Sequence, residues 1–97
     1  MQITKTTNGD ELTIALDGRL DTTTAPDLEA ELGGLGGVKT LVMDMTKLVY
    51  ISSAGLRVLL KAQKLMNKQG SMTVKNISQE IREIFEVTGF DELLNIE

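Results

Sequence analysis

The segment from Thr40 to Met45, TLVMDM, places the strongest constraint on what this chain can fold into. It is nearly continuous in apolar residues, which is typical of a central strand in a parallel sheet, covered on at least one face. A helix is predicted before it, from about Thr24 to Leu32, and another strand, Glu11–Leu16, precedes that helix. Strand, helix and strand in this order form a right-handed crossover unit with parallel strands. The segment therefore predicts an α/β fold.

Two short strands, Gln2–Thr6 and Glu11–Leu16, are predicted to form a hairpin before this unit. The residues between them include Asn8-Gly9, a dipeptide that favours a tight turn between antiparallel strands. Apolar residues alternate with Thr13 and Ala15 in the second strand, as expected when one face is better buried than the other. The chain is predicted to leave this strand at Gly18-Arg19-Leu20-Asp21.

Capping residues predict where three helices begin and end. Thr24 is expected to cap the first helix, and the glycines that follow this helix end it. The second helix is predicted from about Ser53 to Lys68. Ser78 is expected to cap a third helix, which Gly89 ends.

The remaining segments complete the predicted sheet. Met72 and Val74 mark a strand after the second helix, and Leu93–Ile96 is expected to form a short final strand. Together the elements predict one domain over residues 1–97. Its fold class is α/β, with a mixed sheet of four to five strands, a leading β-hairpin and about three helices.

Composition argues against several kinds of protein. The 97 residues include 10 Lys and Arg against 14 Asp and Glu, and this net charge of −4 argues against nucleic-acid binding. No apolar run approaches the ~20 residues that span a bilayer, and no signal-peptide pattern is present, so we expect no membrane partner. Cys and His are both absent. Their absence excludes disulfides and thiolate or imidazole metal sites, which fits a cytoplasmic location.

Enzyme chemistry finds little support in the sequence. Ser52-Ser53 lies between a predicted strand and a helix, as the serine of a hydrolase nucleophile elbow does, but the preceding glycine and the histidine base are missing. The glycine-rich segment 33–40 has Val38 before Lys39, where a phosphate-binding Walker loop requires glycine, and it precedes a strand instead of a helix. We therefore expect no catalytic residue and no cofactor.

Two carboxylates, Asp21 and Asp44, are candidates for a polar site. If they lie at the carboxyl ends of neighbouring strands, both fall near Ser52 and Ser53, where ligands gather in open α/β sheets. An acidic Mg²⁺ pocket like that of a phosphorelay receiver is one interpretation, but the paired acids and the late-strand lysine of such a site are not evident. The alternatives are a turn or helix entry formed by Asp21, and hydrogen bonds from loop amides to Asp44. We expect no metal ion.

Four basic residues, Arg57, Lys61, Lys64 and Lys68, recur on one side of the second predicted helix. Apolar residues fall on its other side. The simplest interpretation is a solvated helix face, because charge runs on surface helices are common. The functional alternative is a surface that docks onto an acidic partner. No aromatic residues lie among the basic ones, which further weakens nucleic-acid binding.

Four segments resemble, in order and at matching spacing, motifs of the STAS domain family, and specifically of its small stand-alone anti-sigma-factor antagonists. They are Gly18-Arg19-Leu20-Asp21, Leu41–Met45, Ser52-Ser53-Ala54-Gly55-Leu56, and the closing helix with Asn76-Ile77-Ser78, Ile84-Phe85 and Thr88-Gly89-Phe90. The family's counterparts are a Gly-x-Leu-Asp turn, an apolar strand with a late Asp, an Asp-Ser-Ser/Thr-Gly-Leu switch and a closing helix. The resemblance covers nearly the whole chain.

The resemblance implies a binding module that phosphorylation switches. Ser53 corresponds to the phosphorylated serine, and Ser52, which replaces the family's usual Asp, is the second choice as phosphoacceptor. Unphosphorylated, such a domain sequesters an anti-sigma factor that is also a serine kinase, and a cognate phosphatase resets it. The residues implied in partner binding are Asp21, Thr22, Asp44, Ser52, Ser53, Ala54, Gly55, Leu56 and Arg57.

A STAS interaction subunit that is not phosphorylated, within a transporter or a stressosome-like assembly, stays open as the alternative. In that case Ser53 is only a helix cap, and the second helix with its basic side chains makes the contact.

Overall fold

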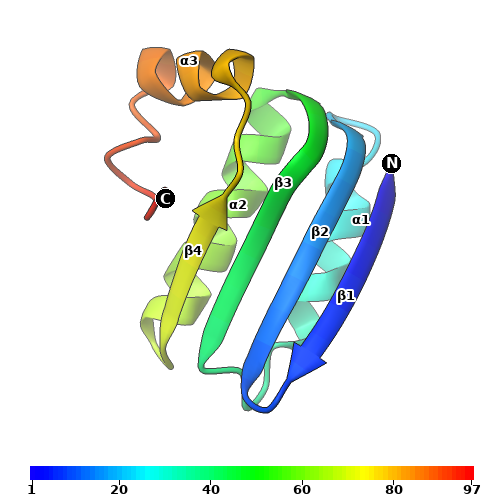
Figure 1. The fold of residues 1–97 in the computed structure, drawn as a ribbon, viewed down its shortest axis with the longest axis vertical. Helices are drawn as coiled ribbons and strands as arrows, with labels where there is room; N and C mark the ends of the chain where they lie inside the picture. Colours follow the sequence, from blue (N-terminus) through cyan, green and yellow to red (C-terminus); the bar gives the residue numbers. More distant parts are fainter.

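Residues 1–97 form a four-stranded sheet with helices packed on one of its faces in the computed structural model (Figure 1). In chain order the elements are β1 (Gln2–Asn8), β2 (Glu11–Leu20), α1 (Ala25–Glu31), a short 3₁₀ turn (Leu32–Gly34), β3 (Thr40–Ile51), α2 (Ser53–Asn67), β4 (Ser71–Lys75) and α3 (Gln79–Thr88). The strand order is β1-β2-β3-β4, with β1 antiparallel to β2 and the other neighbours parallel. The predicted α/β class, leading hairpin and mixed sheet are confirmed.

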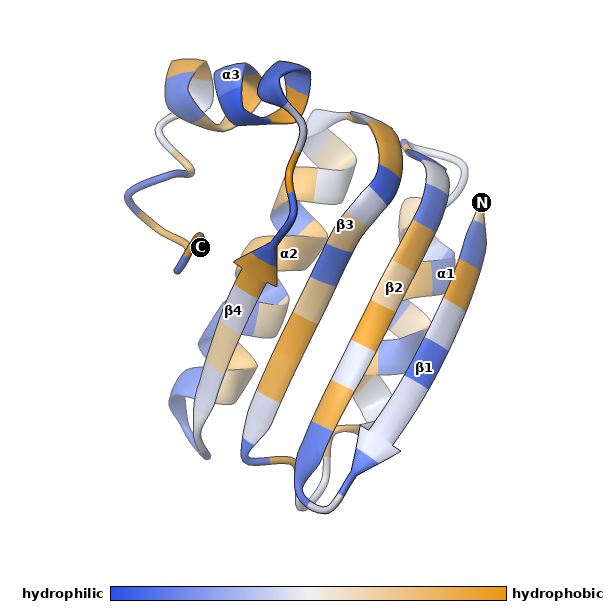
Figure 2. Cartoon of the chain, in the orientation of Figure 1, coloured by the Kyte–Doolittle hydropathy of each residue, from blue (hydrophilic) through white to orange (hydrophobic).

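The hydrophobic core lies between the sheet and its helices. In β2 and β3, Ile14, Leu16, Met43 and Met45 alternate with less buried residues, so one face of each strand is apolar (Figure 2). Side chains from α1 and α2 cover this face, and α3 adds Phe85 from the end of the sheet. The opposite face of the sheet has no helix packed along it. Amphipathic strands and helices therefore close one core and leave one sheet face open.

The two central strands are longer than the sequence predicts. We expected the chain to leave β2 at Gly18 and expected β3 to end near Met45, but β2 continues to Leu20 and β3 to Ile51. The strand register shifts twice in this region, and Gly18 has a φ of +113°, which side chains other than glycine rarely adopt. In β3 these irregularities break the apolar alternation, because the buried residues Met45, Leu48 and Ile51 lie three positions apart. In β2 the alternation continues to Leu20, but Gly18 occupies one of its inward positions.

Two predicted helix ends are confirmed in detail. The N–H of Ile81 donates to Ser78 Oγ (3.2 Å) at the start of α3, and Gly89 ends α3 with a φ of +78°. Thr24 does precede α1, but its side chain makes no capping bond. Thr24 is therefore the N-cap residue by position, as predicted, but its Oγ1 donates to the carbonyl oxygen of Arg19 (2.8 Å).

The predicted final strand is reduced to a single bridge. Ile96 pairs in parallel with Val74 of β4, and the Val74 N–H donates to the carbonyl oxygen of Asn95 (2.8 Å). These contacts tie the last residues to the outer edge of β4, and the sheet keeps four strands.

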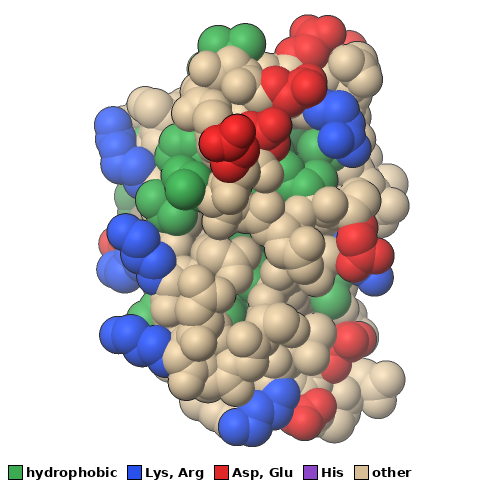
Figure 3. All heavy atoms as spheres, turned by 90° about the vertical axis from the view of Figure 1, so that its left-hand side faces the viewer, with side chains coloured by type: hydrophobic (Ala, Val, Ile, Leu, Met, Phe, Trp, Pro, Cys, Tyr) green, Lys and Arg blue, Asp and Glu red, His purple; other side chains and the backbone are tan.

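Charged side chains are unevenly distributed over the surface. Figure 3 shows Lys and Arg side chains in a column on the helix side of the molecule, while Asp and Glu side chains lie near the upper end and along the opposite edge. No helix is both long and apolar enough to cross a membrane.

We predict that Gly70→Ala destabilises the fold, because a Cβ at this position would overlap the backbone carbonyl of Lys39. Overpacking of this kind costs about 1–3 kcal/mol, and a backbone neighbour cannot rotate away. Gly34→Ala is the matched control, since a Cβ there meets nothing within 4 Å. Urea midpoints should fall clearly for Gly70→Ala and stay near that of the wild type for Gly34→Ala. Equal midpoints would contradict the packing described here.

Candidate functional site

The opening of α2 presents one serine to solvent and uses the other as a cap. Ser52 is half-buried, and its Oγ accepts a hydrogen bond from the N–H of Gly55 (3.4 Å). Ser53 is the first helical residue and is exposed. The cap of α2 is therefore Ser52, and the Ser53 hydroxyl makes no hydrogen bond within the chain.

Close packing against the sheet holds this opening in place. The Ser52 N–H donates to the carbonyl oxygen of Leu20 (2.9 Å), which joins the end of β3 to the end of β2. A Cβ on Gly55 would lie 2.7 Å from Leu20 Cγ and 2.9 Å from Ile51 Cγ1, closer than atoms can pack. Only a glycine lets the first turn of α2 sit this near the sheet.

Two residues of the predicted binding set are buried. Gly55 lies against the sheet, and Leu56 is only 2% exposed within the core. Neither offers surface to a partner in the unbound chain, and their part in partner binding stays a prediction. Their role is to position the exposed residues around them.

The turn between β2 and α1 is organised by Asp21. Its Oδ1 accepts hydrogen bonds from the N–H (3.0 Å) and hydroxyl (2.8 Å) of Thr23 and from the N–H of Thr24 (3.2 Å). These bonds, chiefly the one from the Thr23 hydroxyl, lower the pKa of Asp21 below its usual value, although partial desolvation opposes them. The Arg19 guanidinium lies 3.8 Å from Asp21 Oδ2. Asp21 therefore forms the helix-entry turn that the sequence offered as an alternative.

Three predicted partner-binding residues meet at one depression. Thr22 from the turn and Ala54 and Arg57 from α2 line a hollow between the first turns of the two helices. Pro26 and Glu29 of α1 form its other wall. The Ser52–Leu20 hydrogen bond brings this turn beside the exposed Ser53. The fold thus gathers a continuous surface around the helix opening from segments far apart in the sequence.

Asp44 lies apart from this surface, and the prediction that it falls near the two serines is wrong. Because β3 continues to Ile51, Asp44 sits well within the strand, and its neighbours Met43 and Met45 face the core. Its carboxylate therefore projects on the helix-free face of the sheet. There Asp44 Oδ1 accepts hydrogen bonds from the N–H (3.0 Å) and hydroxyl (2.6 Å) of Thr46 and from Asn76 Nδ2 (3.1 Å).

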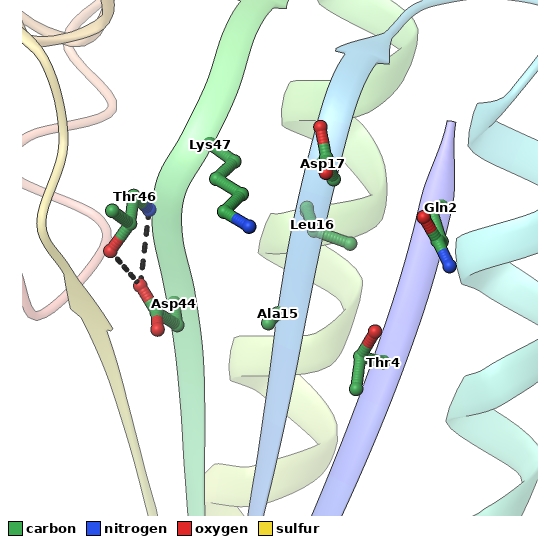
Figure 4. A pocket seen from close by; sticks show the side chains of 8 residues that line it. All are labelled: Gln2, Thr4, Ala15, Leu16, Asp17, Asp44, Thr46 and Lys47. Carbon is green, nitrogen blue, oxygen red and sulfur yellow. Dashed lines mark hydrogen bonds between the residues drawn. The ribbon is translucent and has the colours of Figure 1, made fainter.

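A shallow polar hollow occupies this open face (Figure 4). Its lining residues are Gln2, Thr4, Ala15, Leu16, Asp17, Asp44, Thr46 and Lys47. In Figure 4 the Lys47 side chain extends from β3 toward β2, where Asp17 lies. No three acidic side chains of the chain come close enough to hold a metal ion together. The Mg²⁺ pocket considered from the sequence is therefore not formed by Asp21 and Asp44.

Sequence reasoning missed two surface features beside the helix opening. The Arg19 guanidinium lies 4.3 Å from the centre of the Tyr50 ring, a cation–π contact between paired residues of β2 and β3. The neighbouring Val49 is 67% exposed, which is unusual for a large apolar side chain. Both features follow from the extension of β3 to Ile51 and from the register shift that pairs Arg19 with Tyr50.

The fold and this surface define a small α/β domain with an exposed serine at the first position of α2. The chain belongs to the STAS domain family, whose model matches residues 2–97. The resemblance seen in the sequence is thereby confirmed.

Curated relatives and solved structures agree with this assignment. The chain is 42% identical over 82 residues to BtrV of Bordetella bronchiseptica, which is described as a candidate anti-sigma factor antagonist. The aligned region covers 81% of this chain and 71% of BtrV. It is 25% identical over 99 residues to the anti-sigma-B factor antagonist of Staphylococcus aureus, covering 99% and 92% of the two chains.

Similar solved structures share the fold at low sequence identity. An anti-sigma factor antagonist from Mycobacterium paratuberculosis has a TM-score of 0.88 at 22% identity, over 98% of this chain and 83% of that one. Unphosphorylated SpoIIAA has a TM-score of 0.77 at 19% identity, over 99% and 87% of the two chains. The phosphorylated form of the Bacillus protein SpoIIAA has a TM-score of 0.76 at 19% identity, over 99% and 91%.

We predict that Asp44 makes stability depend on acid pH. Hydrogen bonds, first the one from the Thr46 hydroxyl, lower the pKa of Asp44 below that of the unfolded chain. The resulting stabilisation is present above the unfolded pKa of about 3.9 and is lost as the pH falls through the lower, folded value. The advantage of the wild type over Asp44→Asn should therefore be full at neutral pH and shrink below about pH 4.

Urea unfolding at several pH values measures this difference. Asp17→Asn is the control, because Asp17 lies on the same face and its carboxylate accepts no hydrogen bond. A gap between wild type and Asp44→Asn that stays constant from neutral to acid pH would contradict the prediction.

Proposed function

We propose that this chain is an anti-sigma factor antagonist that phosphorylation of Ser53 switches off. Unphosphorylated, it binds an anti-sigma factor that is also a serine kinase, and the sigma factor is released. A phosphatase removes the phosphate and restores binding. One observation carries the proposal: Ser53 is exposed at the first position of α2, while Ser52 forms the cap. The antagonists among its relatives support the general function.

The helix opening suits a phosphate physically. The first N–H groups of a helix have no partner within the helix, and the helix dipole places partial positive charge there. A phosphoserine adds about −1.5 to −2 charges at neutral pH. Both forms of SpoIIAA match this fold with nearly equal TM-scores, which supports a domain that keeps its shape when modified.

The same phosphate would weaken binding of the partner protein. Ser53 borders the surface formed by Thr22, Ala54 and Arg57, so a bound partner would bury the phosphate or face it closely. Removing a dianion from water is costly without a matched cation, and the ionised Asp21 nearby adds like-charge repulsion. Phosphorylation would therefore break the complex without unfolding the chain.

Ser53 suits the role of acceptor better than Ser52 does. The Ser52 hydroxyl is engaged in the cap and is half-buried, whereas a kinase can reach Ser53 from solvent. Ser52 stands where the family usually has Asp, and it performs the capping that Asp would perform. In this account the chain has no catalytic step and no cofactor of its own. ATP is bound by the kinase, and both proteins act in the cytoplasm.

The second candidate is a STAS subunit that docks without phosphorylation in a transporter or stressosome-like assembly. It is favoured by the basic side chains of α2, which are exposed whatever the state of Ser53.

The test is incubation with the cognate anti-sigma kinase and ATP, with the kinase taken from the neighbouring open reading frames. We expect the wild type to gain one phosphate on the peptide containing Ser53. Ser53→Ala should gain none and should remain bound to the kinase when ATP is added. Mass spectrometry and size-exclusion chromatography report the two results.

Ser52→Ala is the matched control. It should still be phosphorylated at Ser53, and loss of the cap should cost about 1 kcal/mol of stability. Phosphate found on Ser52 alone, or release of the kinase by ATP from the Ser53→Ala chain, would contradict the assignment. A chain that binds its partner but is never phosphorylated would favour the second candidate.

A further inference from the structure

We propose that the outward face of α2 is a docking surface for an acidic segment of a partner protein. We call this surface the basic stripe, and it consists of Arg57, Lys61, Lys64 and Lys68. Docking on the stripe goes beyond the proposed switch at Ser53 and does not require it.

The stripe is a single line of positive charge. With 3.6 residues per helical turn, its members fall within a narrow sector of α2, and all four are exposed. A column of Lys and Arg side chains is visible on the helix side of the molecule in Figure 3.

The positive charge is local and largely unpaired. The whole chain has a net charge of −4, yet α2 (Ser53–Asn67) contains no Asp or Glu. Among the stripe residues only Lys61 has a carboxylate partner, Glu29 of α1 at 3.5 Å. A helix adapted only to solvent commonly mixes both signs, because opposite charges four residues apart stabilise it. The missing acids can instead be supplied by a partner.

Apolar surface accompanies the charge. Leu60 and Leu65 flank the stripe, are only half-buried, and line a hollow together with the four basic residues. An amphipathic segment could place its carboxylates on the basic side chains and a small apolar side chain against these leucines. Helices that lie in grooves are recognised through this combination of anchors.

Other occupants fit this surface less well. A membrane-binding helix inserts its apolar face, but the apolar face of α2, with Val58, Leu59, Ala62 and Met66, is buried in the core. The helix has no aromatic residue for stacking on nucleic-acid bases. A second copy could offer the acidic side chains of α3, but such a head-to-tail contact joins two different surfaces and builds rings or filaments instead of a simple two-fold dimer.

The basic stripe begins one helical turn after Ser53, at the opening of α2. Ser53 lies four residues before Arg57, so both are on the same face of α2. If the proposed phosphorylation occurs, the phosphate would add negative charge at this end of the stripe and repel an acidic segment docked there. This link rests on the proposed function, whereas docking on the lysines does not.

The test uses a designed helical peptide of about 16 residues, with Glu spaced to match the stripe and Leu beside each Glu. We expect amide NMR shifts confined to α2, and an affinity that falls as salt is added. A peptide of the same composition in scrambled order should bind more weakly. Replacing two lysines by Lys64→Gln and Lys68→Gln should weaken binding roughly fivefold, because each exposed pair contributes modestly.

Lys39→Gln with Lys47→Gln is the matched control, since it removes the same charge at exposed lysines outside the stripe. This control should bind the peptide like the wild type. Equal binding of the scrambled peptide, equal weakening by the control pair, or tighter binding to phosphatidylserine vesicles would overturn the proposal. Salt-sensitive self-association in sedimentation, with loss of peptide binding, would overturn it in favour of a second copy. None of these results depends on Ser53, so the stripe and the switch fail separately.

Discussion

The close approach of Gly55 to Leu20 and Ile51 is the contact on which the site depends. It sets the first turn of α2 directly on the ends of β2 and β3, where a Cβ would not fit. The Ser52 N–H bonded to the Leu20 carbonyl oxygen fixes the same junction from the backbone. Because the helix opening is held in this way, the Ser53 side chain is exposed to solvent. A looser junction would let the serine and its helix dipole turn away from the partner-facing surface.

The junction also explains why Gly18 and Asp21 matter although neither touches Ser53. Gly18 adopts a φ of +113° at a register shift, and the strand then reaches Leu20. Asp21 accepts hydrogen bonds from the N–H groups of Thr23 and Thr24, and this turns the chain into α1. Together they place Thr22 beside the opening of α2. The shape of this surface is thus set by residues whose role is structural.

Local chemistry made much of the fold predictable from the sequence. Ser78 begins α3 and Gly89 ends it through bonds to nearby residues. The dipeptide Asn8-Gly9 predicted the hairpin correctly, although its two-residue turn is Gly9-Asp10 because Asn8 pairs with Glu11. The apolar segment at the start of β3 and the helix that follows the two serines were equally visible. Each of these features is set by residues within a few positions of one another.

What the sequence could not supply were features set by distant residues. The length of β3 beyond Met45 depends on pairing with β2 across two register shifts, and apolar alternation does not reveal it. That length decides the place of Asp44, so the prediction that Asp44 lies near the serines failed. The bond from Thr24 to Arg19, and the burial of Leu56, likewise follow from how the turn and the helix meet.

The most direct measurement of the central claim is the thermal unfolding midpoint of the chain carrying phosphate on Ser53, compared with the unmodified chain. A phosphate at a helix opening interacts favourably with the dipole, by about 0.3–1 kcal/mol. The account predicts an unchanged midpoint or a rise of up to several degrees. A fall of about 5 °C or more would mean that the helix opening rejects the phosphate, and it would contradict the account.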